Sequence, residues 1–138
     1  MRQAAATTSA LAALATSLLR YVEEQRRLFA TFGLVCSFFG HAASCNLHID
    51  PVHIDPRVTR EDGELAALFD RVATASYQLV IRHGGSISGE HGDGISRTPN
   101  LPQQYPTVYP LFAKFKALFD PLGLYNPGKI VGEDRLVA

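Results

Sequence analysis

Apolar residues recur every three or four positions in three segments of the chain, which is the spacing of one face of an α-helix. The first segment runs from about Thr8 to Phe32, the second from Leu65 to Val80 and the third from Val108 to Phe119. Glycine follows the first two segments, and Asp120-Pro121 follows the third. Because such residues commonly end helices, the pattern predicts three helices.

Two segments between the first two helices have the character of strands. Leu34–Phe39 is apolar at nearly every position, which predicts a strand covered on both faces. Leu47–Val52 can form a second strand, and Pro51 and Pro56 are expected to limit its ladder. We also expect a short strand at 86–88.

This order of elements predicts an α+β fold, with helices on one face of a small antiparallel sheet. Sheets of two or three strands seldom stand alone. The pattern therefore predicts an incomplete portion of a larger protein.

The composition is that of an ordinary globular domain. The chain has 138 residues, of which 46% are hydrophobic and 19% are charged. Thirteen basic residues balance thirteen acidic ones, so nothing indicates a nucleic acid or an anionic membrane surface as a partner. No apolar run reaches the roughly 18 residues of a transmembrane segment.

The two cysteines, Cys36 and Cys45, are too few for a disulfide framework. This number favours a reducing compartment, and we expect a cytoplasmic protein. Residues 1–19 are rich in Ala, Thr and Ser, which leaves a targeting peptide as an alternative. The helical period continues through them, however.

The segment Gly84–Gly94 combines five glycines with Glu90, His91 and Asp93. Glycine permits positive φ and close approach of the backbone to a ligand. A surface turn would explain such a cluster if it stood alone. A second histidine-bearing segment, 40–48, favours a functional site instead.

His41, His48 and Glu90 form a two-imidazole, one-carboxylate set suited to a divalent transition metal such as zinc or manganese. In one straight strand His41 and His48 would face opposite sides, so they can meet only in a hairpin or a loop. Their spacing matches no zinc-finger or short helical zinc motif. Histidines that cap strands or bond the backbone remain the alternative.

Three neighbouring residues have two interpretations each. His91 could accept a proton from a substrate, or it could bond locally. Arg97 could pair with a substrate carboxylate, or with an acidic side chain of the loop. Cys45 could be a fourth metal ligand or a redox-sensitive thiol, or simply a small buried residue.

Other common signatures are absent. The glycines do not spell the dinucleotide-binding fingerprint, no phosphate-binding Gly-Lys-Ser/Thr occurs, and there is no serine nucleophile elbow. By itself, Asn126-Pro127-Gly128-Lys129 indicates only a turn.

Three motifs occur in an order and spacing that resemble the C-terminal part of FAD-linked oxidases of the vanillyl-alcohol oxidase superfamily. The motifs are Gly40-His41-Ala42 through Asn46-Leu47-His48, then Ser88–Gly94 with Arg97, and Phe119-Asp120-Pro121 through Asn126-Pro127-Gly128-Lys129-Ile130. The group includes D-lactate, glycolate and D-2-hydroxyglutarate dehydrogenases. The resemblance covers about residues 18–131.

The resemblance implies a substrate-side cap domain with a ferredoxin-like antiparallel sheet, as an incomplete C-terminal portion of a flavoenzyme oxidising a 2-hydroxy acid. Within it, residues 1–33 would form a helix and residues 34–94 the metal and catalytic core. Residues 95–131 would form a C-terminal helix and a tail contacting FAD.

The resemblance also implies roles for single residues. His41, His48 and Glu90 would hold the metal, which lowers the proton affinity of the substrate hydroxyl. His91 would take that proton as a hydride passes to the flavin. Asn126 and Lys129 match positions that approach the flavin.

The sequence departs from the family where Ser44-Cys45 replaces a common Asp-Gly. The glycine loop and residues 130–134 look most like the branch that carries an iron–sulfur domain, although two cysteines cannot hold such clusters. The resemblance implies an N-terminal FAD-binding domain or subunit as a partner, with an iron–sulfur subunit and peripheral membrane association through partners in that branch.

Without the FAD-binding domain, we expect the chain neither to bind FAD tightly nor to turn over, and to expose an apolar face. Two other functions stay open. One is a catalytically silent metal-binding or assembly module, and the other is a metal-dependent hydrolase in which His91 activates water.

Overall fold

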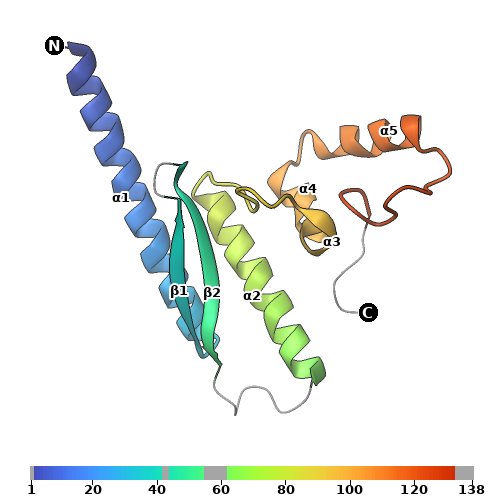
Figure 1. The fold of residues 1–138 in the computed structure, drawn as a ribbon, viewed down its shortest axis with the longest axis horizontal. Coiled ribbons are helices and arrows are strands. Elements are labelled where there is room, and N and C mark those ends of the chain that lie inside the picture. The colour runs from blue at the N-terminus through green and yellow to red at the C-terminus, as the bar shows by residue number, and fades with distance from the viewer. Residues whose placement is uncertain (1, 42–43, 55–61, 133–138) are drawn as a thin grey trace. The chain divides into compact units, whose positions relative to one another are not determined.

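The computed structural model describes residues 2–41, 44–54 and 62–132 (Figure 1). The chain divides into two units, residues 1–65 and residues 66–138. In chain order the helices and strands are α1 (Arg2–Thr31), β1 (Leu34–His41), β2 (Asn46–Ile54), α2 (Asp62–Arg82), α3 (Gly94–Arg97), α4 (Leu101–Gln104) and α5 (Tyr109–Phe119). A 3₁₀ turn, η2 (Thr98–Asn100), joins α3 to α4.

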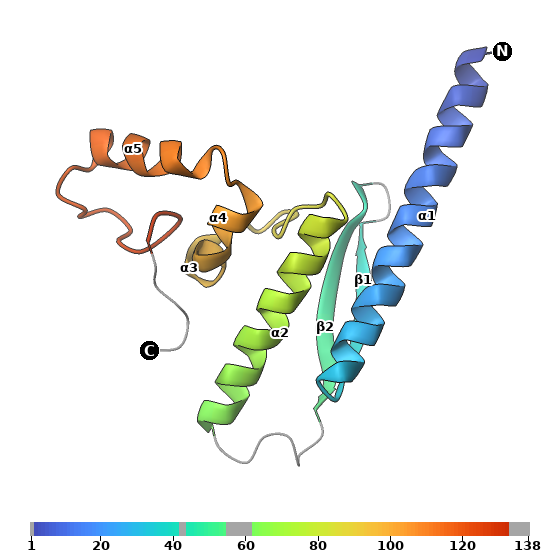
Figure 2. The ribbon, with the colours of Figure 1, turned by 180° about the vertical axis from the view of Figure 1, so that it is seen from behind.

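Helix α1 runs continuously through the segment that could have been a targeting peptide, and it ends as predicted before Gly33, whose φ is 71°. It lies along β1, as both views show (Figures 1 and 2). Gln25 and Phe29 of α1 and Leu34 of β1 are buried. The first unit is therefore a helix packed on a hairpin.

Strands β1 and β2 form an antiparallel pair, from Leu34 opposite Ile54 to His41 opposite Asn46. The register shifts between Val35 and Cys36, where the ladder passes Pro51 through a bulge. The ladder therefore continues past Pro51 to Ile54, contrary to our expectation for Pro51, whereas Pro56 lies outside the described residues. Pro51 itself lies opposite Cys36, and the extra residue at the irregularity is its neighbour Val52.

Gly40 allows the closed end of the hairpin to form. A Cβ atom at this position would lie 2.1 Å from the backbone oxygen of Asn46. No side chain fits in that space. Gly40 therefore lets the strands approach each other just before His41.

In the second unit, α2 carries its buried side chains Leu68, Val72 and Leu79 along one face. The predicted strand at 86–88 is absent from this part of the described chain. The reason lies in Gln104, whose Oε1 accepts from the Ile87 N–H at 3.0 Å and whose Nε2 donates to the Gly85 oxygen at 3.3 Å. A side-chain amide thus satisfies backbone groups that would otherwise need a partner strand.

The fold is α+β with a two-stranded antiparallel sheet, as predicted. The third predicted helix is α5, which ends before Asp120. None of the helices in the described ranges has the length and apolar character needed to cross a membrane.

Candidate metal centre

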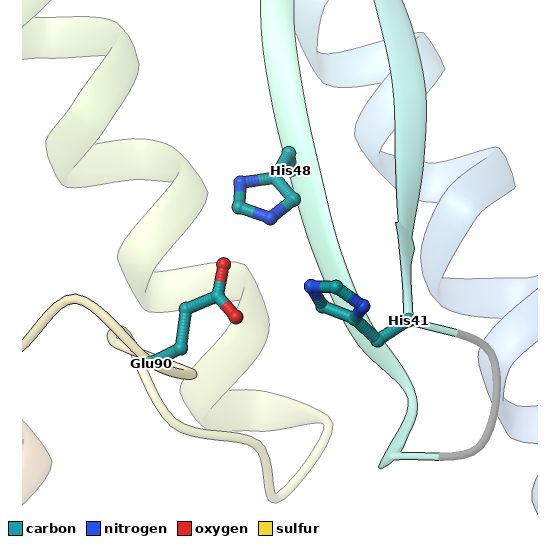
Figure 3. Close-up of side chains that lie close together, drawn as sticks. All are labelled: His41, His48 and Glu90. Carbon is teal, nitrogen blue, oxygen red and sulfur yellow. The ribbon is translucent and has the colours of Figure 1, made fainter.

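The register of the hairpin places His41 and His48 on the same face. His48 lies opposite Phe39, and opposite residues of antiparallel strands point to the same side. His41 lies two residues beyond Phe39, so it shares that side as well. Figure 3 shows the two imidazoles leaving adjacent strands on one side of the hairpin. The hairpin required for the two histidines to meet is confirmed.

The two rings are close enough to share an ion. Their centroids are 6.0 Å apart with an interplanar angle of 72°, and a ring nitrogen of each lies within 4.8 Å of one of the other. His41 is exposed and His48 is half-buried, so water and a small ligand can reach the pair. Two nitrogens bound to one zinc ion at about 2.1 Å each lie at most about 4.2 Å apart. A small rotation of one ring therefore suffices.

Phe39 fixes the orientation of the His48 ring. Their centroids are 5.0 Å apart, and the rings are stacked with an interplanar angle of 15°. Such contact restricts rotation of the imidazole. The Phe39 side chain is 53% exposed, so its ring contributes more to the contact with His48 than to a hydrophobic core.

Glu90 and His91 lie in the glycine-rich loop of the second unit, between α2 and α3 (Figure 3 draws Glu90). The Nε2 of His91 lies 3.1 Å from Oε1 of Glu90. The His91 side chain is 72% exposed, which suits a group that exchanges protons with a ligand. The side chains of Glu90 and His91 therefore contact each other.

Arg97 closes the loop on itself. Its Nη1 donates to the backbone oxygen of Gly92 at 3.0 Å, across the start of α3. Its Nε and the Oδ1 of Asp93 are buried, and neither has a hydrogen-bond partner in the part of the chain that is described. Arg97 therefore holds the loop while part of its donor capacity stays unused.

The tail that carries Asn126 and Lys129 is held by hydrogen bonds. Lys129 Nζ donates to Asn126 Oδ1 at 3.3 Å, which brings these two residues together. The Ile130 N–H donates at 2.8 Å to Oγ1 of Thr98, a fully buried residue at the end of α3. Asn126 and Ile130 have φ of 45° and 66°. The tail thus adopts one defined path next to α3.

Asp120 supports the same tail. Its carboxylate accepts hydrogen bonds from Lys116 and from the N–H groups of Leu124 and Tyr125, the last two at 2.9 Å each. The Lys116 bond, aided by the two backbone donors and opposed by burial, lowers the pKa of Asp120 from its ordinary value. Lys116 also donates to the Tyr125 oxygen.

Comparison with known proteins decides the family. The model of the family described as FAD linked oxidases, C-terminal domain, matches residues 3–130. This chain belongs to that family.

Several relatives of this C-terminal domain are named dehydrogenases. A D-2-hydroxyglutarate dehydrogenase of Pseudomonas putida is 34% identical over 113 residues, which are 82% of this chain and 11% of the relative. A D-lactate dehydrogenase of Archaeoglobus fulgidus is 32% identical over 114 residues, which are 83% of this chain and 24% of the relative. The chain thus spans about a tenth to a quarter of these relatives. No solved structure matches it.

The FAD-oxidase domain has a strained backbone at Cys45, in the turn that follows His41. Cys45 has a φ of 53°, in the region that glycine adopts without steric cost. Ser44 Oγ donates to the backbone oxygen of His41 at 3.3 Å, across this turn. The common glycine would suit this position better. Cys45 therefore strains the turn between the two histidines.

Cys36 and Cys45 are free thiols. This agrees with the expectation that two cysteines do not make a disulfide framework. Burial raises the pKa of the Cys36 thiol, and Arg26 of α1 acts in the opposite direction. The Cys36 thiol is thus less reactive than an exposed one.

Sequence reasoning missed three residues of this domain that position others. The apolar pattern predicts only that Phe39 belongs to a strand. The signal that would identify its role is the hairpin register, which places it opposite His48. Gln104 and Thr98 gave no sequence signal, because each bonds a backbone group that lies far away in the chain.

Proposed function

We propose that this chain is the substrate-binding part of an FAD-dependent dehydrogenase or oxidase that acts on a 2-hydroxy acid. Membership of the FAD-linked oxidase C-terminal domain family supports FAD as the cofactor. Relatives named for D-2-hydroxyglutarate and D-lactate support a 2-hydroxy acid as the substrate. The observation that carries the proposal is the pair of imidazoles on one face of the hairpin.

His41, His48 and Glu90 would hold a divalent ion such as zinc or manganese. The hairpin brings two imidazoles together, and Glu90 of the glycine-rich loop would add a carboxylate. This donor set fits such ions and leaves positions for the hydroxyl and carboxylate oxygens of the substrate. The ion would supply a positive charge that lowers the proton affinity of the hydroxyl.

His91 would accept the hydroxyl proton. Its Nε2 faces Glu90 Oε1, so the neutral imidazole carries its proton on Nε2 and its lone pair on Nδ1. The substrate proton would then move to Nδ1. Glu90 Oε1, which lies 3.1 Å from Nε2, would hold the ring in this orientation.

Arg97 would bind the carboxylate of the substrate. Its Nη1 is fixed by Gly92, and a guanidinium has five N–H donors, so donors of the other terminal nitrogen would remain for the substrate. Asn126 and Lys129 would lie toward the flavin, which supplies the acceptor for the hydride when bound. An iron–sulfur domain in a fused or partner polypeptide remains part of this proposal.

A second candidate function is a catalytically silent metal-binding module, which the imidazole pair of the hairpin would support equally well.

Reconstitution tests the proposal. The chain, combined with a flavin-loaded N-terminal domain, should reduce a dye acceptor with D-lactate or D-2-hydroxyglutarate, lose this activity with a chelator and regain it with Zn²⁺ or Mn²⁺. His91→Gln should lower kcat roughly 10²- to 10⁴-fold with little effect on metal content. Arg97→Lys should mainly raise KM. Chelator-resistant activity, or a His91→Gln variant with normal kcat, would refute the assignment.

A further inference from the structure

The two faces of the hairpin differ in exposure. Leu34 is buried, and α1 lies along its strand. Phe39 and His41 of the same strand point to the opposite face, and both are exposed. We call this second face the histidine face. The strand register assigns to it Ser37, Phe39, His41, Asn46, His48 and Asp50. It is therefore open to a ligand.

Asp50 lies on the histidine face, one row beyond His48. It follows His48 by two residues in β2, so its side chain points to the same side, and the two Cα atoms are about 7 Å apart. Ser37 lies opposite Asp50 in the ladder and shares the face. The Asp50 side chain is exposed. A carboxylate and a hydroxyl therefore lie beside the imidazole pair.

Asp50 is the only charged residue of the hairpin when the histidines are neutral. Residues 34–54 contain no other Asp or Glu and no Lys or Arg. In the described ranges, no basic side chain forms an ion pair with its carboxylate. The histidine face thus carries a negative charge that no cation of this structure neutralises.

This charge bears on the part of a substrate that does not bind the metal. In the proposed function, the ion beside His48 takes the hydroxyl and the neighbouring carboxylate of a 2-hydroxy acid. Lactate has only a methyl group beyond these atoms. In 2-hydroxyglutarate a short carbon chain ends in a second carboxylate, which would lie close to the ion and to Asp50. The two acids therefore differ in charge where the hairpin carries its own.

We propose that Asp50 restricts this site to 2-hydroxy acids without a second negative charge, such as lactate, and disfavours 2-hydroxyglutarate. This inference rests on the proposed function, and it chooses between the acids for which the relatives are named. Repulsion between unit charges about 7 Å apart corresponds to a roughly three- to fiftyfold change in an equilibrium constant, from the dielectric of water to that of a protein surface. The Ser37 hydroxyl offers no compensating charge.

Kinetics of the reconstituted enzyme with both acids test the proposal. The wild type should have a higher kcat/KM for D-lactate than for D-2-hydroxyglutarate. In Asp50→Asn this ratio should fall about three- to fiftyfold, mainly through a lower KM for D-2-hydroxyglutarate. Asp50→Glu should keep the preference, and Asp50→Lys should lower the ratio below that of Asp50→Asn, because it introduces an attractive charge.

Glu24→Gln is the matched control. It removes one negative charge from an exposed side chain of α1, in the same unit of the chain but away from the histidine face. The ratio should equal that of the wild type, and circular dichroism should show that every variant keeps its helices. A wild type that prefers D-2-hydroxyglutarate, or the same ratio in wild type and Asp50→Asn, would overturn the inference.

Added salt distinguishes repulsion from a change in the shape of the site. The Debye length falls from about 10 Å at 0.1 M to about 3 Å at 1 M ionic strength. The preference of the wild type for D-lactate should therefore shrink over this range, whereas the ratio in Asp50→Asn should change much less. An equal response to salt in both proteins would contradict an electrostatic role for Asp50.

Binding to the zinc-loaded chain separates this inference from the proposed function. NMR titration should show weaker binding of D-2-hydroxyglutarate than of D-lactate to the wild type and a smaller difference in Asp50→Asn, at equal zinc content. If this result is obtained but the reconstituted enzyme oxidises neither acid, only the proposed function is refuted. If the enzyme oxidises both acids with a ratio that Asp50→Asn leaves unchanged, only the role of Asp50 is refuted.

Discussion

In the hairpin, eight pairs of backbone partners determine where His41 and His48 lie. In residues 116–130, by contrast, the side chains of Asp120, Lys116 and Thr98 hold the backbone, and the apolar side chains remain in water. In the first region, the pairing of the two strands determines the geometry. The second has an ordered backbone but no core, which is the state expected of a surface awaiting a partner.

The largest expected effect concerns the closed end of the hairpin. Gly40→Ala would place a methyl group 2.1 Å from the Asn46 oxygen, so the strands must separate beside both histidines. We expect a loss of about 2–3 kcal/mol in the free energy of unfolding, measured with urea. Gly63→Ala is the control, because a Cβ there meets nothing within 4 Å. Equal stability of the two variants would contradict the close approach.

The tail should respond to acid because of Asp120. Its folded pKa is lowered, so its contribution is complete above the unfolded value of about 3.9 and is lost as pH falls through the lower folded value. The amide proton shifts of Leu124 and Tyr125 should titrate in that acidic range. In Asp120→Asn these shifts should not titrate there, and both amides should exchange faster. Unchanged titration would show that another group controls the tail.

Phe39 should affect the proposed metal site through His48 alone. Phe39→Leu removes the stacked ring, and we expect zinc affinity to fall about three- to tenfold, the equivalent of one aromatic contact. Val35→Ala alters an exposed apolar residue on the same strand and should leave the affinity unchanged. Calorimetric titration with zinc measures both variants. If Val35→Ala weakens binding as much, the stacking has no specific role.

The smallest effect is a gain in stability at the turn. Cys45→Gly should raise the free energy of unfolding by about 1 kcal/mol, because glycine adopts the φ of 53° without the steric cost that cysteine has. Thermal unfolding should therefore shift to a higher temperature. A lower transition temperature would mean that the Cys45 side chain contributes contacts that outweigh the strain.

The sequence predicted much of the hairpin and little of the tail. Helical periodicity located α1, α2 and α5, and the two strand segments with a connection at 40–46 left either a hairpin or a loop between the histidines. These features depend on neighbours in the chain. The roles of Gln104 and Thr98 depend on bonds to backbone groups 17 and 32 residues away, which leave no pattern in the sequence. The strand expected at 86–88 failed for the same reason.

The most direct test of the metal centre is X-ray absorption of the zinc-loaded chain, together with its metal content. We predict one zinc ion per wild-type chain, with two imidazole nitrogens and a carboxylate oxygen at about 2.0–2.2 Å. His48→Ala and Glu90→Gln should each lose one of these ligands and bind zinc more weakly, whereas His83→Ala should match the wild type. Equal zinc content and an identical spectrum in wild type and His48→Ala would contradict the account.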